Sequence, residues 1–148
     1  MIEFFHVSKS YHGRPALQDV SLTIEKGEFV FLTGSSGAGK TTLLRLIFCG
    51  DAPDEGQILV NGRNLVHLKK SAVPLLRRTM GFVFQDFRLL PKKTVFENVA
   101  LALKVSGVPE GVLRVKTAET LGAVGLGHKV NALPLTLSAG EQQRVCLA

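Results

Sequence analysis

The stretch FVFLTGSSGAGKTT, residues 29–42, passes from four apolar residues into a glycine-rich loop that ends at Lys40 and Thr41. The loop fits the pattern GxxxxGK[ST], which in proteins follows a strand and opens a helix. Residues 29–34 predict that strand, and the apolar spacing of residues 40–50 predicts the helix, which ends at Gly50. The stretch therefore predicts an α/β fold organised around a phosphate-binding loop.

The residue types in this loop suit the chemistry of phosphate. Glycines let backbone N–H groups turn inward around phosphate oxygens, and the N-terminal end of the following helix attracts the same anion. We expect the Lys40 ammonium to bridge the outer phosphates, the Thr41 hydroxyl to ligate Mg²⁺, and Thr42 to reach an inner phosphate. The candidate phosphate-binding residues are Gly34, Ser35, Ser36, Gly37, Ala38, Gly39, Lys40, Thr41 and Thr42.

The composition of the chain limits the classes of protein to which it can belong. With 148 residues, 45% hydrophobic and 20% charged, the chain has the make-up of one globular domain. No apolar run approaches the roughly 20 residues of a membrane span, and the first residues lack the pattern of a signal peptide, so we expect a cytoplasmic protein. Cys49 and Cys146 lack metal-ligand spacing and are expected to be reduced thiols.

The net charge of +6 permits an anionic partner without selecting one. The basic pairs lie at 69–70, 77–78 and 92–93, with no aromatic residues arranged between them for base stacking. We therefore expect no nucleic-acid partner. The four histidines have no partners at ligand spacing, and we assign them no chemistry.

The character of the chain changes along its length. Up to Gln85, short β-rich runs at 2–8, 19–24, 29–34, 57–62 and 80–85 alternate with turn signals, interrupted by helices at 40–50 and 71–78. After Pro91, apolar residues at helical spacing predict helices at 94–105 and 109–125. These patterns predict a β-rich core over residues 1–90 and a helical segment over 91–148.

Three further features accompany the loop. Tyr11 precedes the turn HGRP, where an aromatic ring is suited to stacking on a purine. Gln85 follows the apolar run GFVF, and LSAGEQQR occupies residues 137–144, about 100 residues after the loop. In order and approximate spacing the chain resembles the nucleotide-binding domain of ATP-binding cassette (ABC) proteins, with an aromatic A-loop, a Walker A loop, a Q-loop glutamine and an LSGGQ-type signature. The resemblance extends over essentially the whole chain.

This resemblance implies an α/β P-loop NTPase core with an antiparallel β subdomain and an α-helical subdomain. Its ligands are ATP, stacked on Tyr11, and Mg²⁺, contacted by Thr41 and by Gln85, which also senses the membrane partner and contacts the attacking water. Ser138, Gly140 and Glu141 then face the ATP held by a second nucleotide-binding subunit in a head-to-tail dimer.

The signature also has a purely local interpretation. Ser138 and Glu141 fit the capping box S-x-x-E, so both residues are explained as helix stabilisers without any ligand. Capping and ligand binding are compatible, because a capped helix start with a bare Gly140 still offers donors to an anion. Ala139 departs from the usual glycine of the family but removes no hydrogen-bond donor.

Within the family, the stretches FQDFRLL, TVFENVALAL and LSAGEQQRV look most like the ATP-binding subunits of cell division. Those subunits work with an integral membrane permease, which implies a peripheral location on the inner face of the plasma membrane. ATP-binding subunits of lipoprotein-release and macrolide exporters share much of the same pattern and stay as alternatives.

The resemblance also implies motifs that this sequence does not contain. Walker B, the catalytic glutamate and the switch histidine lie downstream of the signature in the family, so we expect these residues to be the N-terminal portion of an ABC ATPase, with an incomplete core. Three hypotheses follow: an ATPase subunit driving a membrane partner, a module that binds nucleotide without hydrolysing it, and another P-loop enzyme such as a kinase. The kinase would leave Gln85 and LSAGEQQR unexplained.

Overall fold

The computed structural model describes residues 1–148, which form two compact units, Met1–Met80 and Gly81–Ala148. Each unit has its own buried hydrophobic cluster. The antiparallel sheet and the helices confirm the predicted α/β class with a helical segment after the β-rich one. None of the helices combines the length and apolar character that crossing a membrane requires.

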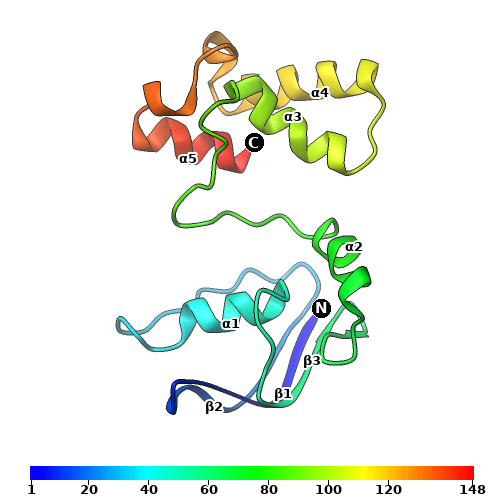
Figure 1. Cartoon of the computed structure of the whole chain (residues 1–148), viewed down its shortest axis with the longest axis vertical. Coiled ribbons are helices and arrows are strands. Elements are labelled where there is room, and N and C mark those ends of the chain that lie inside the picture. The colour runs from blue at the N-terminus through cyan, green and yellow to red at the C-terminus, as the bar shows by residue number, and fades with distance from the viewer. The chain divides into compact units, whose positions relative to one another are not determined.

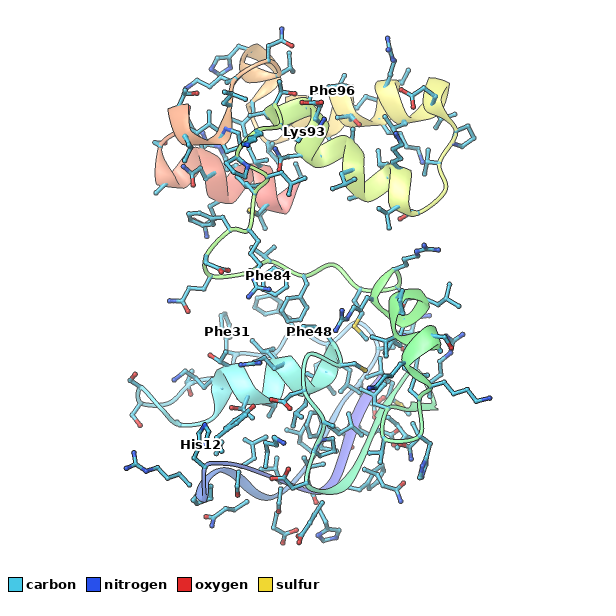
Figure 2. The ribbon with its side chains drawn as sticks, in the orientation of Figure 1. His12, Phe31, Phe48, Phe84, Lys93 and Phe96 are labelled. Atoms are coloured by element: carbon cyan, nitrogen blue, oxygen red, sulfur yellow. The ribbon has the colours of Figure 1, made fainter.

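The first unit contains an antiparallel sheet in the order β2-β1-β3-β4, whose strands are β1 (Ile2–Tyr11), β2 (Arg14–Ile24), β3 (Glu55–Val60) and β4 (Arg63–Asn64). The β1–β2 hairpin turns at His12 and Gly13, which have φ angles of 50° and 75°. Two successive positive φ angles define the tight turn whose twist matches that of paired strands. His12, at this turn, is labelled in Figure 2.

Helix α1 (Lys40–Ile47) packs on this sheet, as the cyan ribbon in Figure 1 shows. Its apolar side, Leu43, Leu46 and Ile47, is buried together with Phe4, Val7 and Ile58 of the strands. Leu76 of the short helix α2 (Val73–Arg77), which follows the 3₁₀ turn η1 (Lys70–Ala72), completes the same core. The core thereby fixes the helix that follows the phosphate-binding loop.

Two of the predicted strands do not form. Residues 29–34 and 80–85 adopt no strand. The strand pairs of the sheet are β1 with β2, β1 with β3 and β3 with β4, and neither segment pairs with any of these strands. Phe29 and Phe31 are 82% and 79% exposed, and their rings meet edge to face at 4.9 Å; Phe31 is labelled in Figure 2. An apolar run signals a preference for burial, but a strand also needs a pairing partner for its backbone groups.

The second unit is helical. Its elements are α3 (Val95–Val105), α4 (Glu110–Ala123), the 3₁₀ turns η2 (Gly127–Lys129) and η3 (Pro134–Thr136), and α5 (Ala139–Leu147). The helices predicted at 94–105 and 109–125 are confirmed to within two residues. The backbone N–H groups of Val95 and Phe96 donate to the carbonyls of Ala132 and Val130, at 2.9 and 3.0 Å, and so join the start of α3 to the chain that leads into α5.

Candidate functional site

The phosphate-binding loop closes around the side chain of its own lysine. Lys40 is the first residue of α1, and its ammonium donates hydrogen bonds to the carbonyl oxygens of Gly34 at 2.7 Å and Ser35 at 2.6 Å. The Ala38 N–H closes the turn on the Ser35 carbonyl at 3.2 Å. A positive charge therefore lies within the curve of the loop, at the N-terminal end of a helix, where both favour an anion.

Gly39 is required at the junction of loop and helix for two separate reasons. Its φ is 83°, a conformation that side chains disfavour, and a Cβ at this position would overlap the Ala16 carbonyl oxygen and approach Leu17 to 2.9 Å. The loop is thus seated directly on the backbone of β2. No side chain caps α1 at Gly39, which leaves the first-turn N–H groups to another acceptor.

The two threonines of the first turn differ in exposure. Thr41 is exposed, whereas Thr42 is buried at 9% exposure. A hydroxyl oxygen beside the phosphate loop is a ligand type that Mg²⁺ accepts, together with phosphate oxygens and water. The residues present therefore fit a magnesium ion on the Thr41 side of the loop.

Tyr11 is the last residue of β1 and lies beside α1, the helix that follows the phosphate-binding loop. Its hydroxyl donates to Oδ2 of Asp51 at 2.6 Å, and the Lys9 ammonium is 5.5 Å from the ring centroid. Burial, followed by the bond to Asp51, raises the pKa of Tyr11, and the Thr42 hydroxyl acts in the opposite direction. The same bond from Tyr11 is the main cause that lowers the pKa of Asp51, so the pair is a neutral phenol and a carboxylate.

Sequence reasoning missed Asp51. It is one acid among several polar residues in a turn after Gly50, and its partner is 40 positions earlier in the chain. A carboxylate directly after Gly50, the predicted end of the P-loop helix, was the one available signal.

The signature segment forms the start of α5. The predicted capping box is confirmed: Ser138 Oγ accepts from the Glu141 N–H at 3.3 Å, and Glu141 Oε2 accepts from the Ser138 N–H at 2.9 Å. Oε1 of Glu141 lies 2.6 Å from the Lys129 ammonium. This ion pair, followed by the bond to Ser138, lowers the pKa of Glu141 to about 2. Gly140 is exposed in the first turn.

Two residues that the sequence analysis did not select hold this helix start in place. One is Lys129, through Glu141. The other is Gln142, whose amide donates to the carbonyls of Pro134 at 3.0 Å and Leu137 at 3.2 Å. A second capping box, at Thr94 and Glu97, begins α3, which shows that the motif alone does not mark a ligand site.

Gln85 is exposed in a turn of the second unit, the unit that also holds Ser138, whereas Tyr11 and the P-loop belong to the first. Close by, the Arg88 guanidinium lies 4.1 Å from the Phe84 ring centroid and 3.2 Å from Asp86. The Cys146 thiol of α5 donates to the Phe87 carbonyl at 3.2 Å. The segment after Gln85 is therefore tied to the helix that the signature begins.

Residues 17–148 match the protein family described as ABC transporter. The chain therefore belongs to the ABC transporter family. The cell division ATP-binding protein FtsE of Bacillus subtilis is 49% identical over 149 residues, which cover the whole chain and 65% of that relative. FtsE of Mycobacterium tuberculosis and FtsE of Escherichia coli are each 48% identical over 150 residues, again the whole chain, and 65% and 67% of their lengths are covered.

The fold is similar to that of a solved ABC cassette, MJ0796. Its dimeric structure, described as a bacterial ABC transporter cassette, superimposes with a TM-score of 0.91 at 37% identity, over 99% of this chain and 67% of that one. A dimeric post-hydrolysis state of the same cassette, bound to ADP and Pi, gives a TM-score of 0.92 at 36% identity with the same coverage. Both the sequence relatives and the fold thus define an ABC ATP-binding cassette similar to FtsE.

Proposed function

We propose that this chain is the ATP-binding part of an FtsE-like subunit that binds and hydrolyses MgATP to drive a membrane partner in cell division. The observation that carries the proposal is the Lys40 ammonium held within the glycine loop at the start of α1. When a triphosphate binds in this loop, the Lys40 ammonium can donate to its charged oxygens in place of the two neutral carbonyl oxygens. Charged oxygens are the stronger acceptors.

We propose the roles of the other site residues from the family resemblance, supported by the positions of the loop residues at the start of α1. Lys40 contacts the outer phosphates, the N–H groups around Gly37 and Gly39 surround them, and Thr42 reaches an inner phosphate. Thr41 would contribute its hydroxyl oxygen to Mg²⁺, and the ABC resemblance assigns the Gln85 amide oxygen to the same ion, which supplies charge neutralisation on the phosphates when it is bound. Gln85 is also the candidate for orienting the attacking water. Tyr11, next to Thr42, offers its ring to the adenine.

The signature residues are proposed to act on the nucleotide of a second subunit. Ser138 Oγ accepts a hydrogen bond from Glu141, so its own proton stays available to donate to a phosphate oxygen. Glu141 is engaged by Lys129 and Ser138 and orients the helix start, while Gly140 leaves the backbone open to close approach. The dimeric state and the ADP and Pi of the MJ0796 structures support this arrangement of two cassettes.

The membrane partner is proposed to be a permease of the FtsX type, which places the subunit at the cytoplasmic face of the plasma membrane. The FtsE relatives support this choice over the lipoprotein-release and macrolide exporters.

The test uses the full-length protein. We expect it to sediment as a monomer without nucleotide and as a dimer with a slowly hydrolysed ATP analogue and Mg²⁺. We also expect phosphate release from ATP that stops when Mg²⁺ is chelated and rises when an FtsX-type permease is present. A protein that neither dimerises on nucleotide nor releases phosphate contradicts the proposal.

A further inference from the structure

We propose that Asp51 is a positioning residue for the nucleotide base, because it fixes the Tyr11 ring before ATP arrives. The inference rests on the proposed function, in which the Tyr11 ring stacks on adenine. Its basis is the 2.6 Å hydrogen bond from the Tyr11 hydroxyl to Asp51, which joins the end of β1 to the turn after α1.

The acceptor itself is held from both sides. Oδ2 of Asp51 accepts the hydrogen bond from the Tyr11 hydroxyl, while Oδ1 accepts one from the Ala52 N–H at 3.0 Å and lies 3.6 Å from the Lys9 ammonium. A carboxylate with both oxygens engaged does not rotate freely, so the direction of the bond to Tyr11 is defined.

Lys9 links the Tyr11 ring to a second carboxylate, that of Asp54. Its side chain is only 12% exposed, and its ammonium pairs with Asp54 at 2.8 Å and lies 5.5 Å from the Tyr11 ring centroid. Asp54 in turn accepts the Ser10 N–H at 2.7 Å. The phenol is thus anchored at its hydroxyl, with a cation over one face at a distance typical of cation–π contacts. Tyr11 remains only half-buried, so part of the ring is accessible.

The location of Tyr11 beside α1 explains why a fixed ring favours binding of the adenine base. The Tyr11 hydroxyl lies near Thr42 in the first turn of α1, and Asp51 lies in the turn that follows α1, which ends at Ile47 and not at the predicted Gly50. Phosphates held at the start of α1 therefore place the nucleoside next to a ring whose orientation is already set. Ordering a mobile side chain on binding costs affinity, and an anchored ring avoids that cost.

The experiment compares two ligands on the full-length protein by calorimetry: MgATP, which has a base, and Mg-tripolyphosphate, which has only the phosphate chain. We expect Asp51→Ala to weaken MgATP binding roughly two- to tenfold, which corresponds to one side chain ordered on binding. Tripolyphosphate binding should be unchanged. Asp51→Asn, which keeps an oxygen acceptor, should restore most of the lost affinity, and Glu55→Ala, which removes an exposed acid of the same unit that does not contact Tyr11, Lys9 or Asp51, is the matched control.

A cycle with Tyr11→Phe tests whether Asp51 acts through the phenol. The double variant Tyr11→Phe with Asp51→Ala should bind MgATP no more weakly than Tyr11→Phe alone. Additive losses, or equal losses for tripolyphosphate, overturn the inference and assign Asp51 a structural role only. If Asp51→Ala does not fold, the same cycle is measured with Asp51→Leu, which also lacks the oxygen acceptor but is close to the aspartate in size, and additivity there decides against the inference.

Tyr11→Ala separates this inference from the proposed function. If Tyr11→Ala leaves the preference for MgATP over tripolyphosphate unchanged, base stacking on Tyr11 is wrong. If it removes the preference while Asp51→Ala and Asp51→Leu both bind MgATP as tightly as wild type, only the role of Asp51 is wrong.

Discussion

The Lys129 ammonium lies 2.6 Å from Oε1 of Glu141, while Oε2 of the same carboxylate accepts the N–H of Ser138 at 2.9 Å. One carboxylate therefore joins η2 to the start of α5 and caps that helix at the signature serine. The signature helix start is held by a residue 12 positions away as well as by its own motif. This arrangement predicts a dependence of stability on pH.

Glu141 has a pKa of about 2 in the folded protein, below its ordinary value of 4.5. Its contribution to stability is therefore present above pH 4.5 and is lost as the pH falls from 4.5 towards 2. Lys129→Met removes the main cause of this shift. We expect the variant to be less stable than wild type at neutral pH, with the difference in unfolding free energy narrowing in acid. Denaturant unfolding of both proteins across this range measures it; a difference independent of pH would contradict the prediction.

Ser138→Arg should separate capping from ligand binding. The variant loses the cap, at a cost of about 0.5 to 2 kcal/mol in stability, and buries a bulky cation against the nucleotide of the second subunit. We expect ATP-driven dimerisation of the full-length protein to be abolished while ATP binding to the monomer is nearly intact. Sedimentation with and without ATP, in a hydrolysis-deficient background, is the measurement.

Thr94→Arg is the matched control, because Thr94 caps α3 in the same unit with the same type of capping box. It should lose a similar amount of stability in a thermal melt and still dimerise. If Ser138→Arg melts normally and also dimerises, LSAGEQQR is only a well-capped helix start.

Lys40→Ala should weaken ATP binding by well over tenfold. A phosphate-facing ammonium makes one or more charge-assisted hydrogen bonds of roughly 1.5 to 3 kcal/mol each. Titration of a fluorescent ATP analogue compares wild type, Lys40→Ala and Lys69→Ala, in which the replaced lysine is exposed and outside the loop. Equal affinities for all three proteins would remove the phosphate-binding role of the loop.

Gly39→Ala should destabilise the first unit more than Gly27→Ala. Both glycines have φ near 82°, so both substitutions carry backbone strain of about 1 kcal/mol or more. Only at position 39 does the added Cβ meet the Ala16 backbone; at position 27 nothing lies within 4 Å. Denaturant unfolding of the two variants measures the difference in unfolding free energy. Equal losses of stability would show that the contact between Gly39 and the Ala16 backbone can adjust at little cost.

Interactions between residues near in sequence were predictable from the sequence itself. The start of α1 at Lys40, the capping box of Ser138 and Glu141, and the helices α3 and α4 depend on hydrogen bonds and apolar contacts three or four residues apart. Such partners are always within reach of one another, so a short pattern suffices to predict them.

Pairing between distant residues was decided only by the tertiary structure. Residues 29–34 are apolar enough for a strand, yet whether they form one depends on a neighbour supplied by another part of the sheet. The bond from Tyr11 to Asp51 spans 40 positions, and the lowered pKa of Glu141 requires Lys129 from another element. No local pattern encodes these partners, because it is the packing of the cores that brings them within hydrogen-bonding distance.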